Sequence, residues 1–125
     1  MRHLNDHRKL GRTSAHRIAL MRNLVAALFE HGRVITTIPK AKEARRYAER
    51  VITYGKKAVA ATDPAKSLHF RRLALSAMGN NKDAVKALVE TVAPKYADRT
   101  GGYTRVLHAG FRLGDKGEKA LFELV

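Results

Sequence analysis

The chain has 125 residues, of which 45% are hydrophobic, and this size and composition suit a single globular domain that buries a core. It contains no cysteine, which excludes disulfides and thiolate metal ligands, and no apolar run approaches the roughly 20 residues that span a bilayer. Its 25 Lys and Arg residues outnumber 11 acidic residues, and the resulting net charge of +14 favours a polyanionic partner. Since the N-terminus does not resemble a secretory signal, we expect a cytoplasmic protein.

The positive charge is concentrated in the first half of the sequence. Residues 1–57 hold 14 basic and 4 acidic residues, whereas residues 58–125 hold 11 basic and 7 acidic residues. We therefore expect the N-terminal half to supply most phosphate contacts, although surface Lys and Arg can also serve solubility alone. An anionic membrane surface fits less well, because no predicted helix pairs a basic face with bulky Trp or Phe side chains.

Residues 1–12 show no apolar periodicity. Polar and basic residues dominate this segment, and Gly11 lies near its end. The composition predicts an extended or disordered basic arm that could become ordered on a nucleic acid, with a frayed terminus as the alternative. We expect residues 13–125 to form one α+β domain.

A first helix is predicted over residues 14–31. Thr13 or Ser14 can cap its start, and Gly32 can end it in the left-handed conformation. Apolar residues spaced three and four apart fall on one arc, which predicts the core-facing side. This arc comprises Ile18, Met21, Leu24, Val25, Leu28 and Phe29.

A short β-branched strand over residues 33–38 precedes a second helix over residues 40–60, and Pro39 suits the start of that helix. One arc of the helix is apolar and mostly small, with Ala41, Ala44, Ala48, Val51, Ile52 and Val59. The opposite arc carries what we call the basic stripe, which comprises Lys42, Arg46, Arg50 and Lys57. Four cations with no acid between them on that arc predict a phosphate-binding surface, and a solvated helix face is the alternative.

A third helix is predicted to follow a strong start signal, because Asp63 can act as the N-cap and Pro64 suits the first helical position. It should run to about Met78, before Gly79. Its predicted inner side chains are Leu68, Leu75 and Met78.

A fourth helix is predicted from Asn80 or Asn81 to Ala93, where Pro94 should terminate it. Its apolar stripe comprises Val85, Leu88, Val89 and Val92.

The last part of the sequence predicts a loop over residues 94–102 and two strands over residues 103–109 and 119–125. Turn-forming residues at 114–117 indicate that these strands form a hairpin. The predicted order is helix, strand, three helices, two strands. We therefore expect an α+β fold in which helices pack on a small three-stranded sheet, with the basic arm extending from it.

The segment from Arg99 to Arg105 is a second candidate for nucleic-acid binding. Gly101 and Gly102 permit close backbone approach and expose amides to anions, and arginines flank them. Tyr103 could stack on a base, or it could instead belong to the core. A phosphate-binding loop of the Walker type is excluded, because the Gly-Lys-Ser/Thr ending is missing.

Histidine-based chemistry finds little support in the sequence. His3 and His7 have a spacing that could bind zinc on a helix, but no helix is predicted there and no further ligands complete the site. No nucleophile elbow or paired-carboxylate motif is visible. We therefore expect no metal, no cofactor and no catalytic residues.

Several segments together resemble the ribosomal protein L17 family of the bacterial large subunit, over essentially the whole chain. The matching segments are Met1–His3, Arg8–Arg17, Arg22–Leu24, Ile35–Thr37, Lys40–Glu43, Val51–Thr53, Pro94–Arg99 and Gly101–Arg105. They are long and occur in the same order, which makes the resemblance specific. One segment departs from the family pattern, because residues 4–7 are Leu-Asn-Asp-His where a basic run with a glycine is usual. The resemblance therefore assigns no phosphate contacts to residues 4–7.

The resemblance implies a structural ribonucleoprotein component of the large (50S) ribosomal subunit, active in translation without being an enzyme. It implies binding to 23S rRNA near the nascent-chain exit, and contact with a neighbouring zinc-ribbon-type ribosomal protein, L32. Together with the charge pattern, it predicts a set of RNA-binding residues. These are Arg2, His3, Arg8, Lys9, Arg12, Ser14, His16, Arg17, Arg22, Lys40, Lys42, Arg46, Arg50, Lys57, Arg99, Gly101, Gly102, Tyr103 and Arg105.

Two other classes of protein are compatible with charge alone. One is a basic architectural protein that binds nucleic acid without a ribosomal role. The other is a small nuclease or RNA-modifying enzyme, which would need a paired general acid and base in a cleft.

Overall fold

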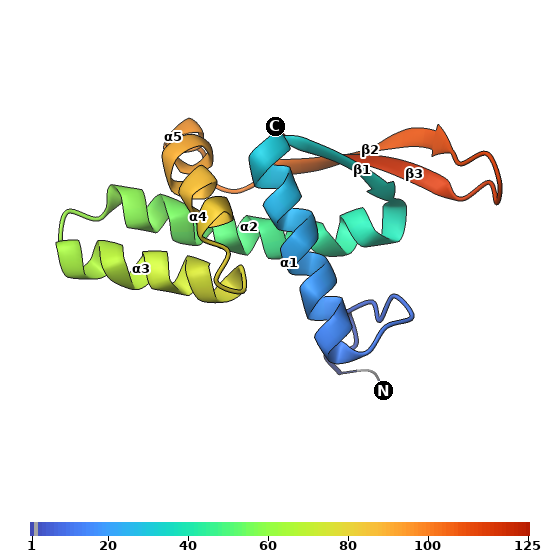
Figure 1. Ribbon diagram of the computed structural model, residues 1–125, viewed down its shortest axis with the longest axis horizontal. Coiled ribbons are helices and arrows are strands. Elements are labelled where there is room, and N and C mark those ends of the chain that lie inside the picture. Colours follow the sequence, from blue (N-terminus) through green and yellow to red (C-terminus); the bar gives the residue numbers. More distant parts are fainter. Residues whose placement is uncertain (2) are drawn as a thin grey trace.

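The computed structural model describes residues 1 and 3–125, which form a small sheet packed against helices (Figure 1). The elements are α1 (Ser14–His31), β1 (Arg33–Thr37), α2 (Ile38–Ala60), α3 (Pro64–Ala77), α4 (Lys82–Ala87), η1 (Leu88–Val92), α5 (Ala93–Lys95), β2 (Thr104–Phe111) and β3 (Glu118–Leu124). The elements α4, η1 (a π-helical turn) and α5 follow one another without a break and together correspond to the predicted fourth helix. The predicted order of elements and the α+β class are therefore confirmed. Arg2, one of the predicted RNA-binding residues, lies outside the described residues.

The sheet has the strand order β1-β3-β2, and both pairings are antiparallel. One row of side chains across the three strands faces the helices, and it comprises Val34, Phe122 and Val106. Phe122 at its centre is fully buried. Because side chains alternate along a strand, the next row points to the other face. Ile35 and Leu107 in that row are 65% and 42% exposed.

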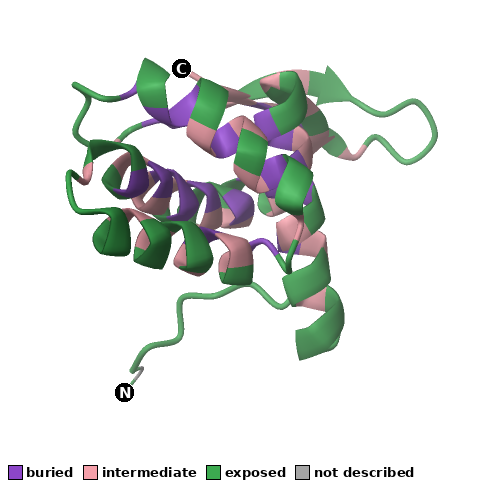
Figure 2. Ribbon diagram, turned by 60° about the vertical axis from the view of Figure 1, so that its left-hand side comes forward, coloured by how far each residue is buried: buried purple, intermediate pink, exposed green. Residues whose placement is uncertain are grey.

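The long helix α2 lies across the middle of the molecule and contacts α1, α3 and the sheet (Figure 1). Its inward side carries Ala41, Ala44 and Ala48, which have no exposed surface. Such small side chains let neighbouring elements approach closely, which fits the burial seen between the helices and the sheet (Figure 2). The predicted small-residue face of this helix is therefore confirmed.

The predicted helix caps are present. The Thr13 hydroxyl accepts a hydrogen bond from the amide of His16, and Gly32 ends α1 in the left-handed conformation, with φ of 81°. The carboxylate of Asp63 caps α3, and the side chain of Asn81 caps α4. Local side chains thus start each of these helices where the sequence indicates.

The prediction that three further residues belong to the core is wrong. Ile18, Val59 and Leu68 are 47%, 44% and 47% exposed. Ile18 lies in the first turns of α1 and Val59 in the last turn of α2, away from the buried residues at the centre of each helix. Leu68 lies in the first half of α3, whereas the residues of this segment that reach the core are Ala74 and Met78, near its end.

The predicted strands over residues 103–109 and 119–125 are shifted slightly, to Thr104–Phe111 and Glu118–Leu124, and two other predicted boundaries also differ from the structure. The β1 strand ends at Thr37, because Ile38 already belongs to α2 and is buried against the core. The fourth helix continues through Pro94 to Lys95 instead of ending at Ala93. A proline ring crowds the carbonyl four residues earlier in a regular α-helix. Here the amide of Ala93 bonds to the carbonyl of Leu88, five residues back, and this wider turn accommodates the proline.

The β2–β3 hairpin projects away from the helices (Figure 1). Its loop includes the predicted turn residues, and a register shift between His108 and Phe111 bends β2 before the loop. Within the loop the Asp115 carboxylate accepts hydrogen bonds from Gly117 and Arg112, and these bonds lower the pKa of Asp115 below its ordinary value of 3.8. Among the described residues, no helix is long and apolar enough to cross a membrane.

Candidate nucleic-acid interface

The basic stripe projects from α2 because the opposite side of that helix is buried. Lys42, Arg46, Arg50 and Lys57 are all exposed. Most of the stripe lines a groove of about 760 Å³ between α2, Arg8 of the arm and strand β2. The groove residues are Arg8, Ile38, Lys42, Arg45, Arg46, Glu49, Arg50, Val106 and His108. Five of these nine side chains are cations, which makes the groove a suitable place for a phosphate backbone.

Glu49 is the one acid in the groove, and its charge is satisfied within the fold. Its carboxylate accepts hydrogen bonds from the amides of Tyr103 and Thr104 at 3.3 and 3.0 Å. A third bond, of 2.8 Å, comes from the Thr104 hydroxyl. Glu49 therefore attaches the first residues of β2 to α2, and its carboxylate is occupied on the side of the strand.

The middle of the arm contacts α2 through two of its residues. Asp6 pairs with Arg46 at 2.7 Å, and His7 lies 3.2 Å from Glu43. The hydrogen bond from the Arg46 guanidinium holds the pKa of the Asp6 carboxyl below its ordinary value of 3.8. The atypical residues at 4–7 thus place a carboxylate on one cation of the basic stripe.

The base of the arm is held by arginine side chains. Arg17 donates hydrogen bonds from one nitrogen to the carbonyls of Lys9 and Arg12, at 3.3 and 3.1 Å. Arg12 donates to the carbonyl of Leu10, which packs against the core. Arg12 and Arg17, which we predicted to bind RNA, therefore already take part in shaping the arm. His3, Arg8, Lys9, Ser14 and His16 are exposed.

Arg22 is half-buried and also has structural contacts. Its guanidinium donates to the carbonyls of Ala77 and Ser76, at 3.3 and 3.4 Å, where α3 ends. Free carbonyls at a helix end attract a positive charge. Lys40, another predicted RNA-binding residue, is partly exposed in the first turn of α2.

The glycine pair of the second candidate segment has the backbone that only glycine adopts easily, because Gly101 and Gly102 have φ of 77° and 63°. The Tyr103 side chain is only 4% exposed, so the core alternative is correct and its ring is not free to stack on a base. Its hydroxyl accepts a 2.8 Å hydrogen bond from Lys56. Burial raises the pKa of this phenol, but the bonds from Lys56 and the Gly101 backbone outweigh it and leave the pKa below 10.0.

The two arginines that flank the glycines do not extend the basic stripe. Arg105 is paired with Glu123 at 2.5 Å, and both side chains lie on the face of the sheet opposite to Phe122. Arg99 is exposed, and its carbonyl accepts hydrogen bonds from Lys56 and Tyr103. The structure thus brings together Arg8 and most of the stripe, but it places Arg105 on a different face.

Two further groove residues, Arg45 and His108, are not among those that the sequence predicts. Arg45 lines the groove beside Arg46, and its spacing of three residues from Lys42 was an available signal. His108 reaches the groove from β2, more than fifty residues away along the chain, and only the fold places it there. Within residues 1 and 3–125, no group of three His, Cys, Asp or Glu side chains could hold a metal ion.

Comparisons with known proteins show the family to which this chain belongs. A family model described as "Ribosomal protein L17" matches residues 20–125. The chain belongs to the ribosomal protein L17 family. The family includes proteins named "Large ribosomal subunit protein bL17" from Bradyrhizobium diazoefficiens, Nautilia profundicola and Novosphingobium aromaticivorans, which are 47%, 45% and 49% identical to this chain. Each comparison covers 100% of this chain and 84%, 98% and 82% of the respective relative.

Membership of the L17 family confirms the resemblance found in the sequence. The relatives are named as ribosomal proteins, and the family is not an enzyme family. This agrees with the expectation of a structural role without catalysis, and it disfavours a nuclease.

Proposed function

We propose that this chain is a structural constituent of the large ribosomal subunit that binds 23S rRNA through its basic groove. Cations on α2 and the arm neutralise phosphates and fix the orientation of the protein, while the shape of the folded RNA supplies specificity. The protein acts in the cytoplasm, within the ribosome, near the nascent-chain exit.

The observation that carries this proposal is the convergence of Arg8, Lys42, Arg45, Arg46 and Arg50 on one groove. These cations come from two parts of the chain, and the single acid among them is bonded to β2. The alternative, a solvated face of α2, does not explain why Arg8 of the arm lies beside the cations of this helix. The family to which the chain belongs consists of ribosomal proteins, which selects rRNA among the possible polyanions.

We further propose that the open face of the sheet contacts a neighbouring ribosomal protein, L32. Ile35, Leu121 and Leu107 form an apolar row on this face, and two of the three are exposed above 40%. An exposed apolar row at the centre of a sheet is the kind of surface that a protein partner buries. The basic groove, by contrast, is suited to RNA.

Photocrosslinking in intact large subunits tests both contacts. A photoreactive residue is introduced in place of Lys42 in the groove, Ile35 on the open sheet face, or Lys66 on α3 as an exposed control. We expect crosslinks from position 42 to 23S rRNA and from position 35 to L32. Two outcomes would contradict rRNA binding by the groove. Position 42 could crosslink only to proteins, or it could give no more rRNA crosslinks than position 66.

A further inference from the structure

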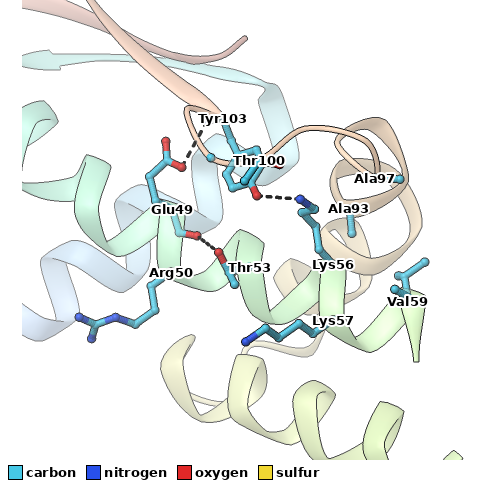
Figure 3. A pocket seen from close by; sticks show the side chains of 12 residues that line it. Glu49, Arg50, Thr53, Lys56, Lys57, Val59, Ala93, Ala97, Thr100 and Tyr103 are labelled. Carbon is cyan, nitrogen blue, oxygen red and sulfur yellow. Dashed lines mark hydrogen bonds between the residues drawn. The ribbon is translucent and has the colours of Figure 1, made fainter. Parts of the chain in front are cut away.

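A second cavity, of about 670 Å³, lies beside the basic groove and is shown in Figure 3. It lies between the C-terminal half of α2, helix α5 and the loop before β2. Its apolar walls come from Val59, Ala60, Ala93 and Ala97. This volume falls within the roughly 300–1,000 Å³ typical of sites that hold a small organic group.

Cations from α2 also line this cavity. Arg50 and Lys57 belong to the basic stripe and line the cavity as well, so the stripe continues from the groove to this cavity. Figure 3 shows both side chains extending from α2 on the side away from Thr100 and Tyr103. Lys57 is exposed, and its ammonium lies 5.5 Å from the centre of the Phe70 ring.

The remaining polar groups of the cavity are mostly fixed by the fold. Lys56 is bonded to the Tyr103 hydroxyl and to the carbonyl of Arg99, and Glu49 is bonded to the start of β2. These bonds hold the walls in place without a ligand. Thr100 and Gly101 add a hydroxyl and backbone groups to the wall, which could hydrogen-bond the edge of a bound ring.

We propose that this cavity receives one unstacked nucleobase of the rRNA whose phosphates follow the basic stripe. An apolar, preformed cavity favours a flat ring, and the cations Arg50 and Lys57 on the neighbouring face of α2 favour the phosphates on either side of that nucleotide. Proteins that recognise RNA by sequence commonly bind unstacked, splayed-out bases and hydrogen-bond their edges. This inference rests on the proposed rRNA binding, and it adds a site that reads a single nucleotide.

The test measures binding of purified 23S rRNA by full-length variants. Ala97→Trp fills the cavity, and Val59→Asn makes its apolar wall polar, while neither removes a cation. Matched controls are Ala65→Trp and Leu68→Asn, because Leu68 and Val59 have similar exposures of 47% and 44%. A base that is excluded from the cavity loses its apolar burial and its hydrogen bonds, so we expect roughly tenfold weaker binding for both cavity variants. The dependence of affinity on salt should not change, because no phosphate contact is lost.

Base-specific chemical probing of the rRNA supplies a second readout, and its first part needs only the wild-type protein. One nucleotide should be protected by wild-type protein, and it should regain reactivity with Ala97→Trp but not with Ala65→Trp. Cavity variants that bind as tightly as the controls, or the lack of such a nucleotide, would overturn the inference. Normal rRNA binding with poor incorporation into subunits would assign the cavity to a protein side chain instead. Failure of the wild-type chain to bind rRNA would overturn the proposed function itself.

Discussion

Asp6 places a negative charge beside Arg46, one of the groove cations, at a position where the family resemblance leads one to expect a basic run. Its carboxylate lies 2.7 Å from Arg46, and His7 and Glu43 also surround this contact. A phosphate that binds the same nitrogen of Arg46 competes with this carboxylate. The lowered pKa of Asp6 follows from the same contact, so this interaction holds the arm on α2 only while the carboxyl is ionised.

We predict that acid releases the arm from α2. The pKa of Asp6 is lowered in the folded chain, so the contact is fully formed above the ordinary value of 3.8 and is lost as the pH falls through the lower folded-state value. NMR signals of the Arg46 side chain should follow this titration. They should not follow it in Asp6→Asn, in which the arm is loosened at every pH.

The same variant should bind 23S rRNA more tightly at neutral pH, by roughly a factor of two to five, because Arg46 no longer has to exchange partners. Asp98→Asn is the matched control, since it adds the same charge at another exposed position. Equal affinities of the two variants would show that Asp6 does not compete with RNA.

Among the helices, Gly55 of α2 and Leu88 of η1 show why two elements can pack so closely. A Cβ atom added at Gly55 would lie 2.7 Å from Cγ of Leu88, which has no exposed surface. Glycine inside a helix normally costs about 1 kcal/mol relative to alanine, so the close approach explains why it stands there. The π-helical turn of which Leu88 is the first residue continues directly into the segment that walls the second cavity.

Gly55→Ala should therefore lower the free energy of unfolding by about 1–3 kcal/mol, despite the better helix propensity of alanine. Gly114→Ala is the control, because nothing lies within 4 Å of a Cβ added in that open turn. Thermal unfolding followed by circular dichroism measures both variants. Partial rescue of Gly55→Ala by Leu88→Val would confirm that the clash is with Leu88, and an unchanged melting temperature would contradict the packing argument.

At the level of elements, local signals predict most of the structure correctly. The caps at Thr13, Asp63 and Asn81 and the small-residue side of α2 depend on neighbouring residues, and the sequence indicates each of them. The exposed Ile18 and Leu68 were misassigned because helical periodicity does not show how far a neighbouring element extends. The passage of the fourth helix through Pro94 depends on a π-turn that no simple pattern predicts.

In the whole molecule, tertiary contacts gather charges that are distant in the sequence. The basic stripe is local to α2 and was predicted, whereas His108 joins the groove only because β2 packs against this helix. Tyr103 shows the opposite effect, because the fold places a predicted stacking ring in the core. The net charge of +14 is therefore partly committed to internal contacts, as with Arg17 and Arg22, and partly free for phosphates.

The most direct test of the account is the salt dependence of 23S rRNA binding by the wild-type chain and by a variant in which Lys42, Arg46 and Arg50 are replaced by alanine. With about 5–8 phosphates engaged, the logarithm of affinity should fall against the logarithm of salt concentration with a slope of roughly −4 to −7. The variant should reduce the steepness by about 2–3, while replacement of the exposed Lys66, Lys82 and Lys86 should leave it nearly unchanged. A flat salt response of the wild-type chain, or equal slopes for the two triple variants, would contradict binding of rRNA through this groove.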